Sequence, residues 1–334
     1  MKNHRRTSVS FRASLGLLGL LSLSVAVAGA VTTSRAAWAG RSGAPAHTAS
    51  AAPHSAKPAH STTLHFTRSG KGPAVVFLHG LGGDSASWIE EAQRLEKTHT
   101  VVLVDLPGHG ASKVPPQGID LLGIGREIAL LIQNERLAPA TIVGHSIGGT
   151  IAGYVALADK TVVRSLVMVD SLLQPYPIAR SERDKIRFQL GRDPAKALTD
   201  FFGAGTRNRD QLDKIIAGAR RVDAKTFMGY LDFASERDDL VERIEEIHVP
   251  VYAVASPLMT QGKSEPIQVQ ASLAQAGFAG LRDFSFDYLA DARHWPHWDQ
   301  PDLFHASLSK FLARVEGPPA QGRPVAKVPG KKLN

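Results

Sequence analysis

The feature that most constrains the fold of this chain is the segment Gly144-His145-Ser146-Ile147-Gly148, which directly follows an apolar run at residues 140–143. A G-x-S-x-G pattern after a buried strand is typical of a sharp turn that leads into a helix. Small residues are needed two positions before and after Ser146, because side chains there would crowd the neighbouring backbone. The turn should expose the serine hydroxyl and direct the first free N–H groups of the helix to the same point. The segment therefore predicts a strand–turn–helix unit with a candidate nucleophile at its turn.

Apolar runs of strand length recur along the chain and alternate with helical patterns. The expected strands cover residues 73–78, 101–105, 140–143, 165–170 and 249–255, and the expected helices cover 119–133, 147–158 and 303–315. Continuous apolar runs indicate strands that are covered on both faces. The expected fold class is α/β, a mostly parallel twisted sheet with helices on both faces. Ligands of such sheets bind at the carboxyl ends of the strands, where Ser146 lies.

Four motifs in a fixed order make the chain resemble the α/β-hydrolase superfamily, in its serine-nucleophile branch with a lid. They are His79-Gly80-Leu81-Gly82-Gly83, Asp105-Leu106-Pro107-Gly108-His109-Gly110, Gly144-His145-Ser146-Ile147-Gly148-Gly149 and Arg293-His294-Trp295-Pro296-His297-Trp298-Asp299-Gln300-Pro301. The resemblance extends from about Thr62 to Glu316. It implies the α/β-hydrolase fold, an inserted helical lid, and a serine–histidine–acid triad beside an oxyanion hole.

The resemblance also implies which residues carry the chemistry. A serine hydroxyl needs a base within hydrogen-bond reach, and the superfamily motif places that base at His294 rather than at His297. The implied oxyanion donors are the backbone N–H groups of Leu81 and Ile147. Structural roles are expected for His79 in the oxyanion loop, His109 in the neighbouring turn, His145 in the elbow, and His297 near the base.

The triad acid departs from the pattern of many relatives, which carry an aspartate after the strand that follows the lid. Here that strand leads into residues 256–265, which contain no aspartate and one glutamate, Glu265. A subset of the superfamily carries the acid at the end of the preceding strand, and this position is Asp170. A carboxylate at the end of a buried strand is costly unless it has a partner. Asp170 is therefore the expected acid, and the alternatives are Glu265, Asp287, Asp291 or no acid at all.

The remaining organisation follows from composition. The core is expected at residues 62–170 and 249–316, and residues 171–248, which contain no strand-like run, should form the helical lid. Asp193, Asn208 and Asp223 are plausible helix starts. The lid aromatics, expected mostly in its own core with one or two facing the substrate, are Phe188, Phe201, Phe202, Phe227, Tyr230 and Phe233.

The two ends of the chain differ from the core in composition. Residues 1–39 have a basic start, an apolar stretch and small-x-small sites after Ala30 and Ala39, as in a bacterial secretory signal. An uncleaved membrane anchor is the rival interpretation. Residues 40–61 should form a disordered linker, and residues 317–334 a flexible basic tail. A periplasmic or secreted protein is expected, with membrane contact only through an uncleaved signal.

The positive net charge does not indicate a nucleic-acid partner. Eleven of the 39 Lys and Arg residues lie in residues 1–61 and 317–334, which contain none of the 31 Asp and Glu residues. The core therefore has 28 basic against 31 acidic residues. The chain has no cysteine, which excludes disulfides and a cysteine nucleophile.

These observations favour hydrolysis of carboxylic esters of small apolar substrates, with a small molecule as the partner and without a cofactor. The same triad would serve cleavage of a carbon–carbon bond in a diketone, of a lactone or of a thioester. A non-catalytic binding protein that keeps the fold is an alternative of another class. A metal hydrolase on His294, His297 and Asp299 is a third. The oligomeric state is left open.

Overall fold

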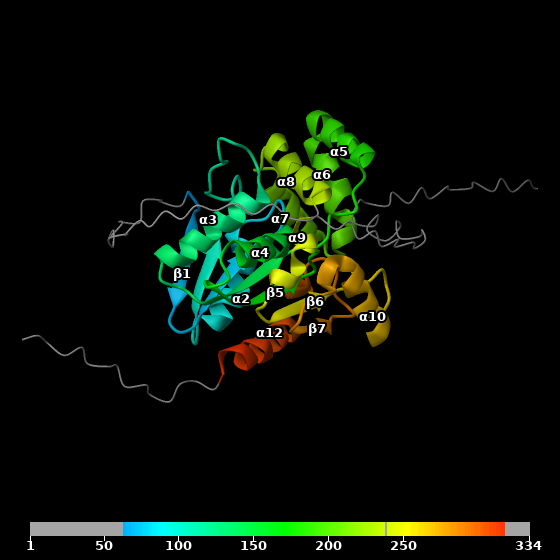
Figure 1. Ribbon diagram of the computed structural model, residues 1–334. Coiled ribbons are helices and arrows are strands. Elements are labelled where there is room, and N and C mark those ends of the chain that lie inside the picture. The colour runs from blue at the N-terminus through cyan, green and yellow to red at the C-terminus, as the bar shows by residue number, and fades with distance from the viewer. Residues whose placement is uncertain (1–62, 238, 318–334) are drawn as a thin grey trace, which may run out of the picture.

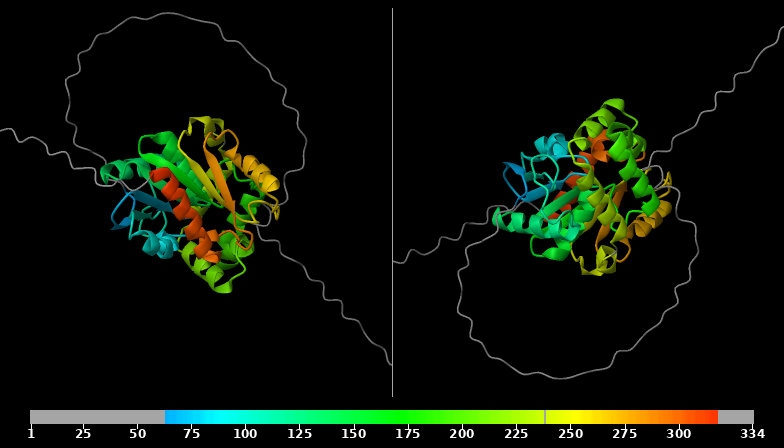
Figure 2. Two further views of the ribbon diagram at one scale, coloured as in Figure 1. Left: turned by 90° about the horizontal axis from the view of Figure 1, so that it is seen from below. Right: turned by 90° about the horizontal axis from the view of Figure 1, so that it is seen from above.

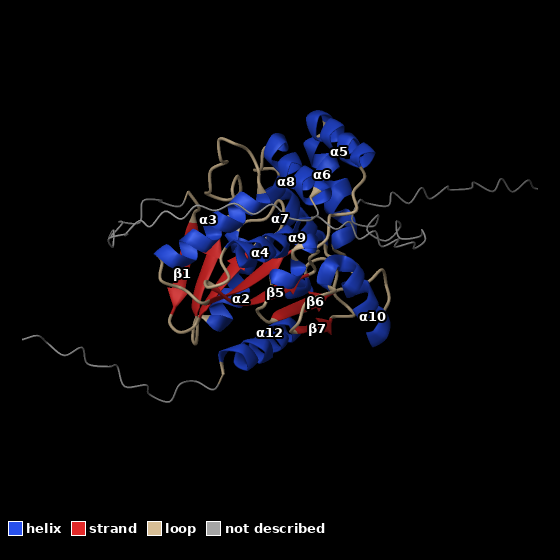
Figure 3. Ribbon diagram, viewed as in Figure 1, coloured by secondary structure: helices blue, strands red, loops and turns tan. Residues whose placement is uncertain are grey.

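The computed structural model describes residues 63–237 and 239–317. Within these ranges the chain forms a seven-stranded sheet between layers of helices, which Figure 1 and Figure 3 show. The strands are β1 (Phe66–Gly70), β2 (Ala74–Leu78), β3 (Thr100–Val104), β4 (Ala140–His145), β5 (Val163–Val169), β6 (Val251–Ala255) and β7 (Phe284–Tyr288). Their order across the sheet is β1-β3-β2-β4-β5-β6-β7. β1 pairs antiparallel with β3, and all other described pairs are parallel. The expected α/β class with a mostly parallel sheet is confirmed.

The helices alternate with the strands as the sequence predicted. The α-helices are α2 (Ile89–Leu95), α3 (Leu121–Asn134), α4 (Ile147–Ala158), α5 (Arg180–Arg192), α6 (Pro194–Phe202), α7 (Arg209–Ala219), α8 (Ala224–Glu236), α9 (Asp239–Glu242), α10 (Pro266–Leu273), α11 (Pro296–Asp299) and α12 (Pro301–Glu316). Short helical turns are η1 (Ser85–Trp88), η2 (Gly203–Gly205), η3 (Ile244–Glu246) and η4 (Ala274–Phe278).

The side chains of each buried strand alternate between two apolar layers, because successive residues of a strand point to opposite faces. In β2, Val76 and Leu78 pack in the layer that contains α3 and α4. Val75 and Phe77 pack on the other face, against α2 and α12. Figure 2 shows α12, in red, lying across the sheet when the molecule is seen from below. Burial on both faces explains why these strands are continuous apolar runs.

The edge strand β1 has no counterpart among the predicted strands. Phe66 is half-buried and the other four residues of β1 are exposed, so the strand contains no apolar run. Its position is determined by pairing of its backbone with β3 over the register Phe66 to Val104 and Gly70 to Thr100. A pairing of this kind has no signal in a hydropathy pattern.

The segment between β5 and β6, residues 171–248, is helical and is called the cap below. Its helices begin where the sequence suggested, because the side chains of Asp193, Asn208 and Asp223 accept N–H groups at the first turns of α6, α7 and α8. Such side-chain contacts at a helix N-terminus stabilise a helix by about 1 kcal/mol each. Figure 1 shows α5, α6 and α8 together at one end of the molecule, beyond the sheet.

Three sequence predictions fall largely outside the part of the chain that the structure describes. They are the signal segment 1–39, the linker 40–61, and the tail 317–334 apart from Gly317. Among the described residues, none of the helices combines the length and the apolar character needed to cross a bilayer.

Candidate active site

Ser146 lies at the sharp turn between β4 and α4, with φ 51° and ψ −123°. This conformation is rare for a residue with a side chain and costs about 1–3 kcal/mol. The surrounding glycines permit it. A Cβ atom on Gly144 would lie 2.4 Å from the backbone of Gly148, and a Cβ atom on Gly148 would lie 2.6 Å from the carbonyl oxygen of His79. The sequence pattern therefore reflects a steric requirement of the turn.

Two backbone N–H groups are available beside Ser146. Among the described residues, neither Leu81 nor Ile147 donates its N–H to another group, and both residues line the same cavity as Ser146. Leu81 belongs to the loop after β2, called the oxyanion loop below (residues 79–83). Gly80 brings this loop against the elbow, since a Cβ atom there would lie 2.6 Å from Nδ1 of His145. The cavity wall beside Ser146 thus includes two residues whose backbone N–H groups have no partner among the described residues.

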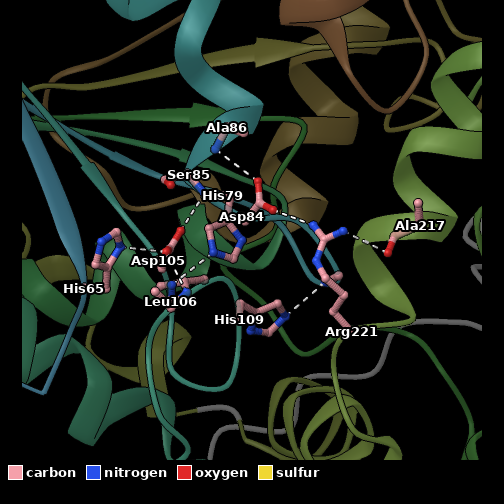
Figure 4. A network of polar contacts seen from close by, with 12 residues as sticks. His65, His79, Asp84, Ser85, Ala86, Asp105, Leu106, His109, Ala217 and Arg221 are labelled. Atoms are coloured by element: carbon pink, nitrogen blue, oxygen red, sulfur yellow. Dashed lines mark hydrogen bonds and ion pairs between the residues drawn. The ribbon is translucent and has the colours of Figure 1, made fainter.

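Polar contacts around His79 and His109, which Figure 4 draws, hold the oxyanion loop. His79 donates from Nδ1 to the carbonyl oxygen of Gly80 (2.8 Å) and accepts at Nε2 from the N–H of Leu106 (3.0 Å). His109 accepts at Nε2 from the N–H of Gly82 (3.1 Å) and contacts the carbonyl oxygen of Pro107 with Nδ1 (3.1 Å). These bonds require both imidazoles to be neutral with the proton on Nδ1.

The electrostatics of this network agree with that tautomer. Burial lowers the pKa of His109 to about 3, and burial also lowers the pKa of His79. Burial alone would raise the pKa of Asp105, but hydrogen bonds from the N–H groups of Ala111 and Ser85 outweigh it and leave that pKa below its usual range. His65 Nδ1 also lies 2.8 Å from Asp105 Oδ2. The loop is therefore held by neutral histidines and an ionised aspartate.

His294 and Asp170 form a buried pair at the carboxyl end of the sheet. His294 Nδ1 lies 2.8 Å from Asp170 Oδ2, and Asp170 Oδ1 accepts from the N–H of Ser256 (2.9 Å). The N–H of His294 donates to the carbonyl oxygen of Gly205 in the cap (2.9 Å). His294 lines the cavity together with Ser146. No hydrogen bond joins these two side chains within the described part of the chain, and such contacts often tighten only when substrate binds.

Within the described residues, no hydrogen bond or ion pair joins His294 to any of the alternative acids. Asp287, on β7, accepts from the hydroxyls of Tyr252 (2.7 Å) and Ser307 (2.6 Å). Glu265 precedes α10 and is exposed, and Asp291 is exposed as well. Asp170 is the carboxylate that the fold brings to the histidine.

The neighbouring histidines contact other groups. His145 Nε2 lies 2.6 Å from the carbonyl oxygen of His294, which orients the loop of the base. His297 stacks on Trp88 with ring centroids 4.0 Å apart, and both of its buried nitrogens lack a hydrogen-bond partner among the described residues. Asp299 accepts from the N–H of Arg293 (2.7 Å). The described residues contain no group of three or more side chains placed to hold a metal ion.

The cavity above Ser146 has a volume of about 190 Å³ and a mainly apolar wall. The oxyanion loop contributes Leu81, the elbow Ile147 and the loop of the base Trp295, while the cap contributes Ile178, Phe201, Phe202, Leu231 and Ala234. Two of the six cap aromatics thus face the cavity. Phe227 packs on Phe201 and Phe202 within the cap, and Phe188 is exposed. The other two contact the core: Tyr230 donates its hydroxyl proton to the carbonyl oxygen of Pro107 (2.9 Å), and Phe233 packs on Tyr154 of α4.

His297 leads to a prediction about stability and pH. Burial lowers the pKa of His297 to about 3, whereas the unfolded chain titrates near 6.5. Between these pH values the unfolded chain binds a proton at His297 and the folded protein does not. The free energy of unfolding should therefore decrease as pH falls from 6.5 towards 3. His297→Phe keeps the ring stack and removes the titration. The unfolding free energy of the variant minus that of wild type should therefore be about 2 kcal/mol larger at about pH 5 than at about pH 7.5.

Urea unfolding of both proteins at the two pH values measures this difference. The exposed His248 supplies a control, since His248→Gln removes a histidine outside the core. An equal difference between His297→Phe and wild type at both pH values would show that His297 is not a source of acid sensitivity.

The comparison with known proteins identifies the family. A model of the Alpha/beta hydrolase family matches residues 75–307, more than half of the chain. This chain belongs to the alpha/beta hydrolase family. The esterase from Thermogutta terrifontis has the same fold, with a TM-score of 0.65 and 21% identity over 76% of this chain and 94% of that chain.

Two curated relatives of this alpha/beta hydrolase illustrate the range of the family. The chain is 27% identical over 259 residues to the dihydrolipoyllysine-residue acetyltransferase component of an acetoin cleaving system from Cupriavidus necator. It is 38% identical over 110 residues to a pimeloyl-[acyl-carrier protein] methyl ester esterase from Pseudoalteromonas atlantica. These matches cover 75% and 32% of this chain and 66% and 41% of the relatives, less than two thirds of either relative's length.

Two features of this site could not be predicted from the sequence. The Asp105 carboxylate, in a turn motif, contacts His65 beside β1 and accepts from the N–H of Ser85 after the oxyanion loop. Tyr176 of the cap lines the cavity beside Ser146. Neither role has a local signal, since each depends on partners far away in the chain.

Proposed function

We propose that this hydrolase cleaves carboxylic esters with small apolar acyl groups through an acyl-enzyme on Ser146. The observation that supports this most strongly is the arrangement around one cavity. Ser146 at its strained turn, the uncommitted N–H groups of Leu81 and Ile147, and His294 all lie there, and His294 is paired with the buried Asp170.

In the proposed reaction, Ser146 Oγ attacks the ester carbonyl carbon while His294 Nε2 takes the hydroxyl proton. Asp170 keeps the other ring proton on Nδ1 and stabilises the imidazolium. The N–H groups of Leu81 and Ile147 bind the oxyanion, and each such donor is worth roughly 10²–10³ in rate. His294 then gives its proton to the leaving alcohol oxygen. Water enters, and the same groups in reverse order release the acid.

The cavity wall supports the substrate class. Its sides are formed by Phe201, Phe202, Leu231, Ile178 and Trp295, and burial of apolar area favours binding by about 25 cal/mol per Å². The volume of about 190 Å³ suits a small acyl group rather than a long chain. The similarity to a methyl ester esterase over 110 residues agrees with an ester bond.

Fluorophosphonate labelling followed by intact mass and peptide mapping tests the proposal. The purified protein should gain one label, at Ser146, and lose hydrolysis of short-chain nitrophenyl esters in proportion. Labelling at another serine, such as Ser307, would point to a non-specific reaction. The Ser307 hydroxyl donates to Asp287 and has no part in the proposed site. A protein that takes no label and hydrolyses no ester would refute the acyl-enzyme and favour a non-catalytic binding protein.

A further inference from the structure

Tyr176 presents a buried hydroxyl at the reaction centre without an established partner. It lies in the loop between β5 and α5, where its N–H donates to the carbonyl oxygen of Ala234 (2.8 Å). Its Oη atom is buried and makes no contact with hydrogen-bond geometry among the described residues. An unpaired buried hydroxyl costs about 1–3 kcal/mol, so a functional reason is expected.

Three hydroxyl side chains, those of Thr150, Ser146 and Ser171, act on Tyr176 and lower its pKa in part. Two of them already donate their protons to carbonyl groups. Ser171 Oγ already donates to the carbonyl oxygen of Ser146 (2.6 Å), and Thr150 Oγ1 donates to that of Leu172 (2.7 Å). Because none of the described groups meets Tyr176 Oη with hydrogen-bond geometry, the phenol proton remains available to a ligand in the cavity that Tyr176 lines with Ser146.

Tyr176 and His294 line the same two spaces beside Ser146. The oxyanion loop lines the cavity through Leu81, whereas Tyr176 lines both this cavity and a smaller cleft of about 80 Å³ behind it. His294 lines both spaces as well, and Asp170 lines the cleft. In the proposed reaction the ester carbonyl oxygen would point to the backbone donors. The leaving oxygen must come within reach of His294, which returns the proton and which shares both spaces with Tyr176.

Building on the proposed function, we infer that the Tyr176 hydroxyl donates a hydrogen bond to the leaving-group oxygen of the ester. In the step concerned, the bond between the acyl carbon and the leaving oxygen breaks, and the electron pair stays on that oxygen. The proton comes from His294 Nε2, and Tyr176 keeps its own. Tyr176 stabilises the negative charge that builds up before the proton arrives.

The charge state of the phenol agrees with this role. Burial raises the pKa of Tyr176 above its ordinary value of 10.0, and the surrounding hydroxyls offset only part of this effect. The side chain therefore remains a neutral donor at working pH. A donor of this kind helps most when the leaving alkoxide is a strong base, as in an alkyl ester, and least when it is a nitrophenolate.

The variant Tyr176→Phe tests the inference with two ester series that share one acyl group. For alkyl esters, kcat/KM should fall by about 10- to 100-fold, the effect of one hydrogen bond to a charged group. For nitrophenyl esters it should fall by less than about threefold, because that leaving group is stable without the bond. The slope of log kcat/KM against the pKa of the leaving alcohol should therefore become steeper.

Tyr252→Phe is the matched control, since Tyr252 packs on Phe311 of α12 and donates to Asp287. Fluorophosphonate labelling of Tyr176→Phe at the wild-type rate would show that the fold and the nucleophile are intact. An equal loss for both ester series, or no loss for either, would overturn the role of Tyr176 while the proposed function stands. A wild-type protein that neither labels nor hydrolyses esters would overturn both.

Discussion

Asp170→Asn should lower kcat/KM for nitrophenyl esters by roughly 10⁴-fold, the effect of the same change in serine–histidine–aspartate triads. The geometry explains why. Asp170 Oδ1 accepts from the N–H of Ser256 (2.9 Å), and Oδ2 faces Nδ1 of His294 (2.8 Å). An asparagine that keeps the first bond with its oxygen turns its NH₂ group to the histidine. Nδ1 must then be unprotonated, and the ring proton moves to Nε2, where it blocks uptake of the serine proton.

The rates of ester hydrolysis and of fluorophosphonate labelling measure this effect, and both should fall together. Glu265→Gln is the matched control, because Glu265 is an exposed carboxylate of the segment where many relatives carry the acid. Its activity should stay within about twofold of wild type, as for a surface change. A labelling rate unchanged in Asp170→Asn and lost in Glu265→Gln would transfer the role of the acid to Glu265.

Gly144→Ala should both destabilise the protein and remove most of its activity. The new methyl group would lie 2.4 Å from the backbone of Gly148 and from the N–H nitrogen of Gly149, so the start of α4 has to move. Overpacking of this kind lowers stability by about 1–3 kcal/mol. We expect a loss near the larger value, because the methyl group would meet backbone atoms rather than a flexible side chain. A displacement of about 1 Å at Ser146 is enough to reduce kcat by about 10²-fold.

Gly191→Ala serves as the control for this substitution. Gly191 lies in α5, and a Cβ atom there would meet nothing within 4 Å. This variant should gain about 0.5–1 kcal/mol, because alanine loses less backbone entropy than glycine in a helix. Urea unfolding and ester hydrolysis of the two variants, measured side by side, separate the steric effect from the general effect of replacing a glycine. Wild-type stability and activity in Gly144→Ala would contradict the steric account of the elbow.

Elements with a local signal could be predicted from the sequence, whereas elements placed by distant partners could not. The strands β2 to β6 are visible as apolar runs, and Gly144 and Gly148 mark the turn through steric needs that are local. Edge strand β1 is exposed except at Phe66, and its position depends on pairing with β3. The helix starts at Asp193, Asn208 and Asp223 were predicted because a capping hydrogen bond at a helix N-terminus involves only residues within three positions of each other.

The sequence by itself determined the α/β class, the order of the four motifs, the turn at Ser146 and the family to which the chain belongs. These depend on period, on steric needs within a few residues, and on motifs that can be read directly. Only the tertiary structure decided which carboxylate contacts His294, which cap aromatics line the cavity, and that a tyrosine hydroxyl stands beside Ser146. The physical reason is distance along the chain. Hydrogen bonds and cavity walls join residues from separate strands and from the cap, and the packing of the sheet brings them together.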